Sequence, residues 1–208
     1  MSSPIVSDTN CPSCGAATPP LLKHSKLAVC AYCDSTLFIE DAQVASAGEK
    51  SVLTEIPSIL CLGQQFHVGN WTFEPMGRIR YEYGASEGYW DEWWVQLSSG
   101  GTKWISNDEG EYVVENEVEF DGEMLAYDQL EIGAAIDILG KTLRVTEINH
   151  ATCTGIEGQL PEIIHPGATH RYAHLEGENS ALVTLEYEEE SLFVFEGVWL
   201  DPFEIKTA

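Results

Sequence analysis

The stretch Met76-Gly-Arg-Ile-Arg-Tyr-Glu-Tyr83 decides the fold class, because its side chains alternate between two kinds. Its apolar and aromatic side chains fall on one face of an extended chain and its charged ones on the other: Ile79, Tyr81 and Tyr83 against Arg78, Arg80 and Glu82. Downstream, Trp93–Leu97 and Thr102–Ile105 flank a loop that contains two glycines, which predicts a hairpin. This part of the chain therefore predicts a β-sheet.

A related pattern returns later in the chain. Five positions match five others at a constant offset of seventy residues: Leu60, Leu62, Gly63, Phe66 and Val68 against Leu130, Ile132, Gly133, Ile136 and Ile138. Each copy ends in a hairpin, which in the second copy joins Ala181–Tyr187 to Ser191–Trp199. We expect two related β units, residues 52–125 and 126–205, that pack together as one barrel or sandwich, since each alone would expose an apolar face.

The chain is strongly acidic: its 208 residues include 34 acids and 10 bases, for a formal charge of -24. Binding to nucleic acid or to an anionic membrane surface is not expected, because both rely on Lys and Arg. Direct membrane insertion is not expected either, since no segment supplies about 20 apolar residues. The N-terminal residues show no signal-peptide pattern, so we expect a cytoplasmic protein with reduced thiols.

Four of the six cysteines form two matched pairs: Cys11, Cys14, Cys30 and Cys33. This spacing is typical of a zinc site, in which four thiolates close a tetrahedral shell and leave no position for a substrate. The alternatives are two disulfides, which suit an exported chain, or a redox site, which uses one pair. We expect one structural Zn²⁺ in a zinc ribbon at residues 1–40. A linker or short helix at 41–51 and an all-β domain at 52–208 would follow.

The other two cysteines stand apart from this pattern. Cys61 lies in the apolar run Ile59–Leu62 and is expected to be a small buried hydrophobic residue. Cys153 follows His150 by three residues, so a thiolate–imidazole pair is conceivable, although spacing identifies no third member.

The segment Trp90-Asp-Glu-Trp-Trp94 has two interpretations. Four of its residues are candidates for binding a ligand or a partner: Trp90, Asp91, Glu92 and Trp94. If Trp93 and Val95 face the core, then Glu92 and Trp94 point the other way, and two aromatics beside acids on an outer face would make a binding patch. The alternative is that every tryptophan is used for packing.

Acids are concentrated from Asp108 to Asp137, where eleven occur without a Lys or Arg. The alternation in Glu115-Asn-Glu-Val-Glu-Phe120 suggests a solvated strand edge or loop, whose charge deters aggregation. The alternative is an electronegative surface for a basic partner or a polyamine. A polyamine would be held by clustered carboxylates with aromatic walls, and salt would weaken its binding.

Three histidines crowd into one short segment: His165, His170 and His174. A second metal site is conceivable, because His170 and His174 are four residues apart. Pro166 and Gly167 instead indicate a loop, in which histidines more often meet solvent or form hydrogen bonds. Because no enzyme motif stands elsewhere in the chain, a metal-dependent enzyme using this cluster is the weaker hypothesis.

Several motifs resemble the domain of unknown function 4178 family. They are Gly77-Arg-Ile-Arg-Tyr-Glu-Tyr-Gly84, Trp90-Asp-Glu-Trp-Trp-Val-Gln-Leu97, Gly101-Thr-Lys-Trp-Ile105, Gly110-Glu-Tyr112, Gly158-Gln-Leu-Pro161, Leu185-Glu-Tyr187 and Phe195-Glu-Gly197. The resemblance implies an all-β domain without an established activity, in several members behind a zinc ribbon. Members are often encoded near spermidine-synthase-like proteins. Gln159 stands where the family tends to have a glutamate.

These features together predict a non-enzymatic binding or adaptor protein. The zinc ribbon would be a structural clip, and the acidic β domain would engage a partner protein, a basic one in particular. The alternative is a module that binds a small ligand, either a polyamine or another cation.

Overall fold

The computed structural model describes residues 9–40, 43–84, 87–122, 125–188 and 191–208. The N-terminal residues 1–8, where no signal-peptide pattern was found, lie outside the described part. The described chain is mainly β, with three short 3-10 helices at Tyr127–Gln129, Glu178–Ser180 and Pro202–Glu204. None of the helices within the described ranges has the length and apolar character needed to cross a membrane.

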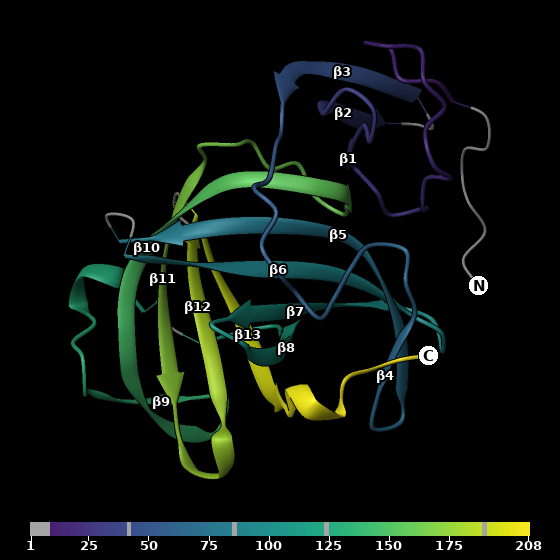
Figure 1. The fold of residues 1–208 in the computed structure, drawn as a ribbon. Helices are drawn as coiled ribbons and strands as arrows, with labels where there is room; N and C mark the ends of the chain where they lie inside the picture. Colours follow the sequence, from purple (N-terminus) through teal and green to yellow (C-terminus); the bar gives the residue numbers. More distant parts are fainter. Residues whose placement is uncertain (1–8, 41–42, 85–86, 123–124, 189–190) are drawn as a thin grey trace.

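Eight antiparallel strands close into a barrel, which confirms the expected fold class (Figure 1). In spatial order they are β5 (Trp71–Tyr83), β6 (Gly88–Leu97), β7 (Thr102–Asp108), β8 (Glu111–Glu117), β13 (Ser191–Leu200), β12 (Leu182–Glu188), β11 (Thr169–Glu176) and β10 (Lys141–Leu160). Pairing of β10 with β5 closes the circle, so no barrel strand is left with a free edge along its whole length.

The two halves of the chain contribute equally to this barrel. Each half supplies four consecutive strands, and each set begins with a short strand that pairs with it: β4 (Phe66–Val68) with β5, and β9 (Ala135–Ile138) with β10. The halves meet where β8 pairs with β13 and where β5 pairs with β10. A two-residue strand, β14 (Lys206–Thr207), lies beside β4. Each half therefore depends on the other to close the barrel.

One of the three larger apolar cores, around Ile79 and Ile156, faces the barrel interior, whereas the other two lie on the outer side of its wall. Trp93, Val95 and Ile105 are buried there by Leu60 and Phe66, which precede the barrel in sequence. On the other half, apolar residues of 118–122 and 125–139 pack against the outer faces of β11, β12 and β13. Because side chains alternate along a strand, the residues between these apolar positions point into the barrel.

A small N-terminal sheet, which we call the ribbon, continues the barrel sheet. It consists of β1 (Leu27–Val29), β2 (Ser35–Glu40) and β3 (Gln43–Lys50), and β1 pairs with the far end of β10. The expected linker at 41–51 is therefore wrong for residues 43–50, which pair with β2 as a third strand because this satisfies β2's remaining backbone groups. Residues 41–42 lie outside the described part.

Gln159 fastens the ribbon to the barrel. Its Oε1 atom accepts hydrogen bonds from Leu22 N and Ser25 Oγ, each 2.9 Å away. Its Nε2 atom donates to the carbonyl oxygen of Pro20 over 3.0 Å. Gln159 is 4% exposed, so these bonds replace water that the amide has lost.

Candidate functional site

The register of the barrel strands shows which side chains face its interior. Residues that are direct partners on neighbouring strands point to the same side of a sheet. One such row runs around the barrel through Ile79, Glu92, Ser106, Val113 and Trp199. The neighbouring outward row is the one that Leu60 and Phe66 cover, so this row lies inside.

Two cavities occupy the barrel interior, with volumes of about 410 Å³ and 220 Å³, and we call them together the acidic lumen. Four side chains line both cavities: Glu92, Glu115, His170 and Glu186. The larger cavity adds Glu117, Glu162 and Glu188, and the smaller adds Asp108, Glu111, Glu147 and Glu176. Within the described part of the chain, neither cavity is lined by a lysine or an arginine.

Burial changes the protonation of these acids. Desolvation raises the pKa of Glu92 to about 8. Trp90 Nε1 donates a hydrogen bond to the Glu92 carboxylate, which lowers the pKa, but by less than desolvation raises it. Burial and the charges of Glu92 and Glu115 likewise raise the pKa of Glu186 well above its ordinary value. Burial raises the pKa of Asp108 to about 6. Without a cation, some of these carboxyls must therefore hold protons at neutral pH.

One carboxylate of the lumen stays charged because it has polar partners. The Tyr172 hydroxyl donates a hydrogen bond to Glu147 Oε1 over 2.6 Å, and His174 Nδ1 lies 3.1 Å from Glu147 Oε2. The hydrogen bond with His174 lowers the pKa of Glu147 more than burial raises it. Glu147 is therefore a fixed negative charge at the smaller cavity.

Aromatic rings complete the lumen wall. The Trp90 ring lies 5.3 Å from Tyr81, 5.8 Å from Tyr83 and 5.1 Å from Tyr172 between centroids. Trp90 and Tyr172 line the smaller cavity, and Tyr81 lines the larger one. Aromatic faces beside carboxylates are the surroundings that favour an organic cation.

The structure places three of the four expected binding residues on the inner side of the barrel wall. Trp90, Glu92 and Trp94 do share one face of β6, but this face is turned inward rather than out, because Trp93 and Val95 carry the covered outer side. Trp94 is 2% exposed and serves packing. Trp90 and Glu92 line the acidic lumen.

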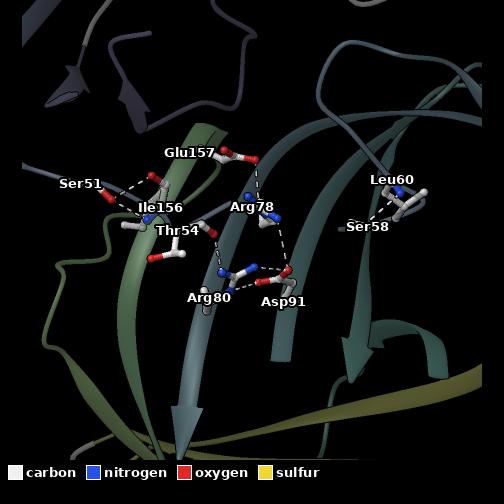
Figure 2. A network of polar contacts seen from close by, with 9 residues as sticks. All are labelled: Ser51, Thr54, Ser58, Leu60, Arg78, Arg80, Asp91, Ile156 and Glu157. Atoms are coloured by element: carbon white, nitrogen blue, oxygen red, sulfur yellow. Dashed lines mark hydrogen bonds and ion pairs between the residues drawn. The ribbon is translucent and has the colours of Figure 1, made fainter. Parts of the chain in front are cut away.

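Asp91 lies on the opposite side of the wall, in an ion-pair network (Figure 2). Arg80 donates from Nε to Asp91 Oδ1 over 2.7 Å and from a terminal nitrogen to Oδ2 over 2.8 Å. Arg78 reaches the same Oδ2 atom over 3.3 Å and Glu157 over 3.0 Å. Asp91 is 3% exposed, so it joins β5 to β6 and is withdrawn from any ligand.

Part of the acidic stretch from Asp108 also has a different setting from the one expected. β8 is paired on both sides, so Glu115 and Glu117 do not stand on a solvated edge; they line the lumen. The sequence signal for them is their spacing: Glu115 and Glu117 are two residues apart, which puts both on one polar face of the strand. Only closure of the barrel makes that polar face the inner one.

The three histidines are not brought together as one metal site. His170 and His174 both face the lumen from β11, whereas His165 lies on the loop after β10 and pairs with Glu49 of the ribbon. Burial lowers the pKa of His170 to about 4, and its buried Nε2 atom has no hydrogen-bond partner within the described structure. A neutral ring nitrogen without a partner is available to a ligand in the lumen.

The four expected cysteines do come together. Their sulfurs lie within 4.8 Å of one another, and Cys11 and Cys33, like Cys14 and Cys30, are 3.8 Å apart. A tetrahedral shell with metal–sulfur bonds of about 2.3 Å has sulfurs about 3.8 Å apart, so the cluster fits a metal ion. Hydrogen bonds with the side chain and backbone of Ser35 lower the pKa of Cys33 to about 6, whereas the neighbouring thiol of Cys33 helps to raise the pKa of Cys14 to about 12. Without a metal, Cys33 is therefore a thiolate at neutral pH before Cys14 is.

The two remaining cysteines take no part in this cluster. Cys61 is exposed, and its thiol donates a hydrogen bond to Gln64 Oε1 over 2.8 Å. The expected burial is wrong because Leu60 and Leu62 pack on the core, while Cys61 between them points outward. Cys153 is 1% exposed, and burial raises its pKa to about 12, whereas His150 is exposed. A thiol that holds its proton this firmly is a poor nucleophile.

These features define a class of protein: a closed eight-stranded barrel with an acidic interior, joined to a four-cysteine clip. A model of the family described as Domain of unknown function (DUF4178) matches residues 62–202, and the chain belongs to this family. The matched part contains all eight barrel strands, and the ribbon precedes it. Searches of curated proteins and of solved structures return no match.

Proposed function

We propose that this protein is a non-enzymatic binding module whose acidic lumen holds a small organic cation. The observation that carries the proposal is the lining of both cavities by carboxylates, including Glu92, Glu115 and Glu186, with no lysine or arginine among the described lining residues. Buried carboxylates are costly unless they are protonated or paired, and a cation that enters the lumen supplies the missing pair.

The walls favour an organic amine over a bare metal ion. Trp90 and Tyr172 offer aromatic faces at the smaller cavity, where Glu147 keeps its charge. Among the described residues, the cysteines are the single group whose ligand atoms approach closely enough for a metal. A polyamine suits the lumen because its ammonium groups can meet carboxylates while its carbon chain lies against aromatic rings.

A role as an adaptor for a partner protein has less support from the geometry. It relied on an outer patch at Trp90, Glu92 and Trp94, and these side chains face inward. Because the barrel is closed, another protein's surface cannot contact these inward-facing side chains. Small-ligand binding is therefore the function that these residues support best.

Titration calorimetry with spermidine tests the proposal. We expect binding by the full chain at low salt, weakened at high salt because the attraction is electrostatic. Glu186→Gln, which removes one lumen carboxylate at almost constant shape, should lower the affinity roughly tenfold. The control is Glu131→Gln, the same change at an exposed site away from the cavities. No spermidine binding at low salt, or equal loss in both variants, would contradict the proposal.

We also propose that the metal of the ribbon is Zn²⁺ in a structural role. Four thiolates leave no open coordination position, and soft sulfur ligands in a tetrahedron favour this ion. Such an ion would hold the two cysteine pairs together and order the ribbon without contacting a ligand in the lumen.

A further inference from the structure

A loop at the end of the barrel forms one wall of the larger cavity. It runs from residue 161 to 168, between β10 and β11, and Ile163, Ile164 and His165 line the cavity from it. Glu162 of the same loop is one of the lumen acids. The position of this loop therefore decides how well the larger cavity is enclosed.

Two neighbouring strands of the ribbon, β2 and β3, contact His165 of this loop. The Phe38 ring of β2 meets the His165 ring edge-on, with centroids 5.6 Å apart. Glu49 lies on β3, and its Oε1 atom is 2.6 Å from His165 Nδ1. His165 is thus fastened to two ribbon strands at once, by a ring contact and by a polar contact.

The ribbon also fixes the point at which the loop begins. Lys26 N donates to the carbonyl oxygen of Leu160 over 2.9 Å, and Leu27 is the register partner of Leu160. Ile164 and Phe38 both pack against the apolar cluster that contains Leu27 and Leu160. The backbone before the loop and the side chains within it therefore rest on the same ribbon strands.

The ribbon itself has little apolar material to keep it folded. Its own buried clusters consist of Cys11, Cys30 and Leu37, and of Leu21, Ala28 and Ile39. A module of this size with so small a core relies on a metal for its fold. Because two metal-ligand cysteines belong to the first cluster, losing the ion removes the centre of that core.

We propose that the ribbon is a metal-dependent latch, which holds loop 161–168 against the larger cavity and so controls how fast a ligand leaves the lumen. The ligand part of this inference rests on the function proposed above; the coupling between ribbon and loop does not. With the metal bound, Phe38 and Glu49 hold His165. When the metal leaves, β2 and β3 lose their order, the loop is released, and the cavity loses a wall.

Hydrogen exchange measured on the full chain tests the latch without a ligand. We expect residues 161–168 to exchange faster after chelation of the metal, while amides of β12, which lies away from the ribbon, keep their protection and report an intact barrel. His165→Ala in the zinc-loaded protein should accelerate exchange of the same loop roughly threefold to tenfold, because it removes both contacts with the ribbon. Glu131→Gln is the control and should change nothing.

Spermidine release then tests the functional part. His165→Ala and chelation should each speed its dissociation and lower its affinity, with zinc content measured to show that His165→Ala retains the metal. If chelation unfolds the whole chain, the zinc-loaded His165→Ala and Phe38→Ala variants decide the matter. Unchanged loop exchange in these variants overturns the latch. Altered exchange with unchanged spermidine dissociation overturns control of the lumen, and absence of spermidine binding overturns the proposed function alone.

Discussion

Trp90 and Glu92 are joined within one strand: Trp90 Nε1 donates a hydrogen bond to Glu92 Oε1 over 2.8 Å. Both side chains point inward from β6, so the bond lies in the wall of the smaller cavity. It gives the buried carboxyl one donor, which is too little to offset burial, and the pKa of Glu92 remains raised to about 8. The pair therefore presents an aromatic face beside a carboxyl that changes charge near neutral pH.

The raised pKa of Glu92 makes stability depend on pH. Between pH 4.5 and about pH 8 the folded chain holds a proton that the unfolded chain has lost, so folding stability falls as pH rises through this range. Glu92→Gln keeps an acceptor for Trp90 and removes the titration. We expect this variant to be more stable than the parent at pH 8 by about 4 kcal/mol and equal to it near pH 4.5. Urea unfolding at several pH values measures this, and a pH-independent difference would contradict it.

Ligand binding should release protons. A cation in the lumen stabilises the charged forms of Glu92 and Glu186, and so lowers the two raised pKa values. We expect spermidine affinity to increase between pH 6 and pH 8, by up to about tenfold per pH unit for each proton released. Calorimetry at one pH in buffers of different ionisation enthalpy counts these protons. A heat of binding that does not depend on the buffer would count against the buried acids as the binding groups.

The network around Asp91 is expected to stabilise the fold without affecting binding. Asp91→Asn leaves the buried guanidinium groups of Arg78 and Arg80 without their shared carboxylate. We expect a loss of about 3 kcal/mol in the free energy of unfolding. The exposed Asp121 provides the matched control, since Asp121→Asn alters the same charge outside this network. Chemical denaturation compares the two, and equal stabilities would show that the arginines find other partners.

The four-cysteine cluster predicts one zinc ion per chain. Cys30→Ser should abolish zinc binding and lower the melting temperature, because it removes a ligand from a buried position of the ribbon. Cys61→Ser, at an exposed cysteine outside the cluster, should keep the full zinc content. Elemental analysis of both purified variants gives the answer. Zinc retained in Cys30→Ser would place the metal elsewhere.

Gln159 is expected to hold the ribbon to the barrel through its neutral amide. Gln159→Glu removes the donor to Pro20 and buries a carboxylate at a site that is 4% exposed, so we expect ribbon docking to weaken by about 2 kcal/mol. Gln129→Glu makes the same change at an exposed position. Hydrogen exchange of Leu27–Val29 reports the docking of β1 to β10. Unchanged protection in Gln159→Glu would show that strand pairing alone suffices.

Local patterns in the sequence determined much of this protein. The spacing of Cys11, Cys14, Cys30 and Cys33 determined the four-cysteine cluster, because two tight turns leave four sulfurs few other arrangements. The alternation in Met76–Tyr83 and the glycines after Leu97 fixed the β5, β6 and β7 strands, since period and turn chemistry act over a few residues. They also showed that Trp90, Glu92 and Trp94 share a face.

Only the tertiary structure decided which face of each barrel strand points into the barrel. A period of two separates the sides of a strand but does not say which side is enclosed. Pairing of β10 with β5 closed the barrel, and segments distant in sequence, including Leu60 and Phe66, covered the apolar outer side. The acids of β6, β8 and β12 were left inside together. That Glu186 lies beside Glu92 follows from contacts between residues about ninety positions apart, which no local pattern encodes.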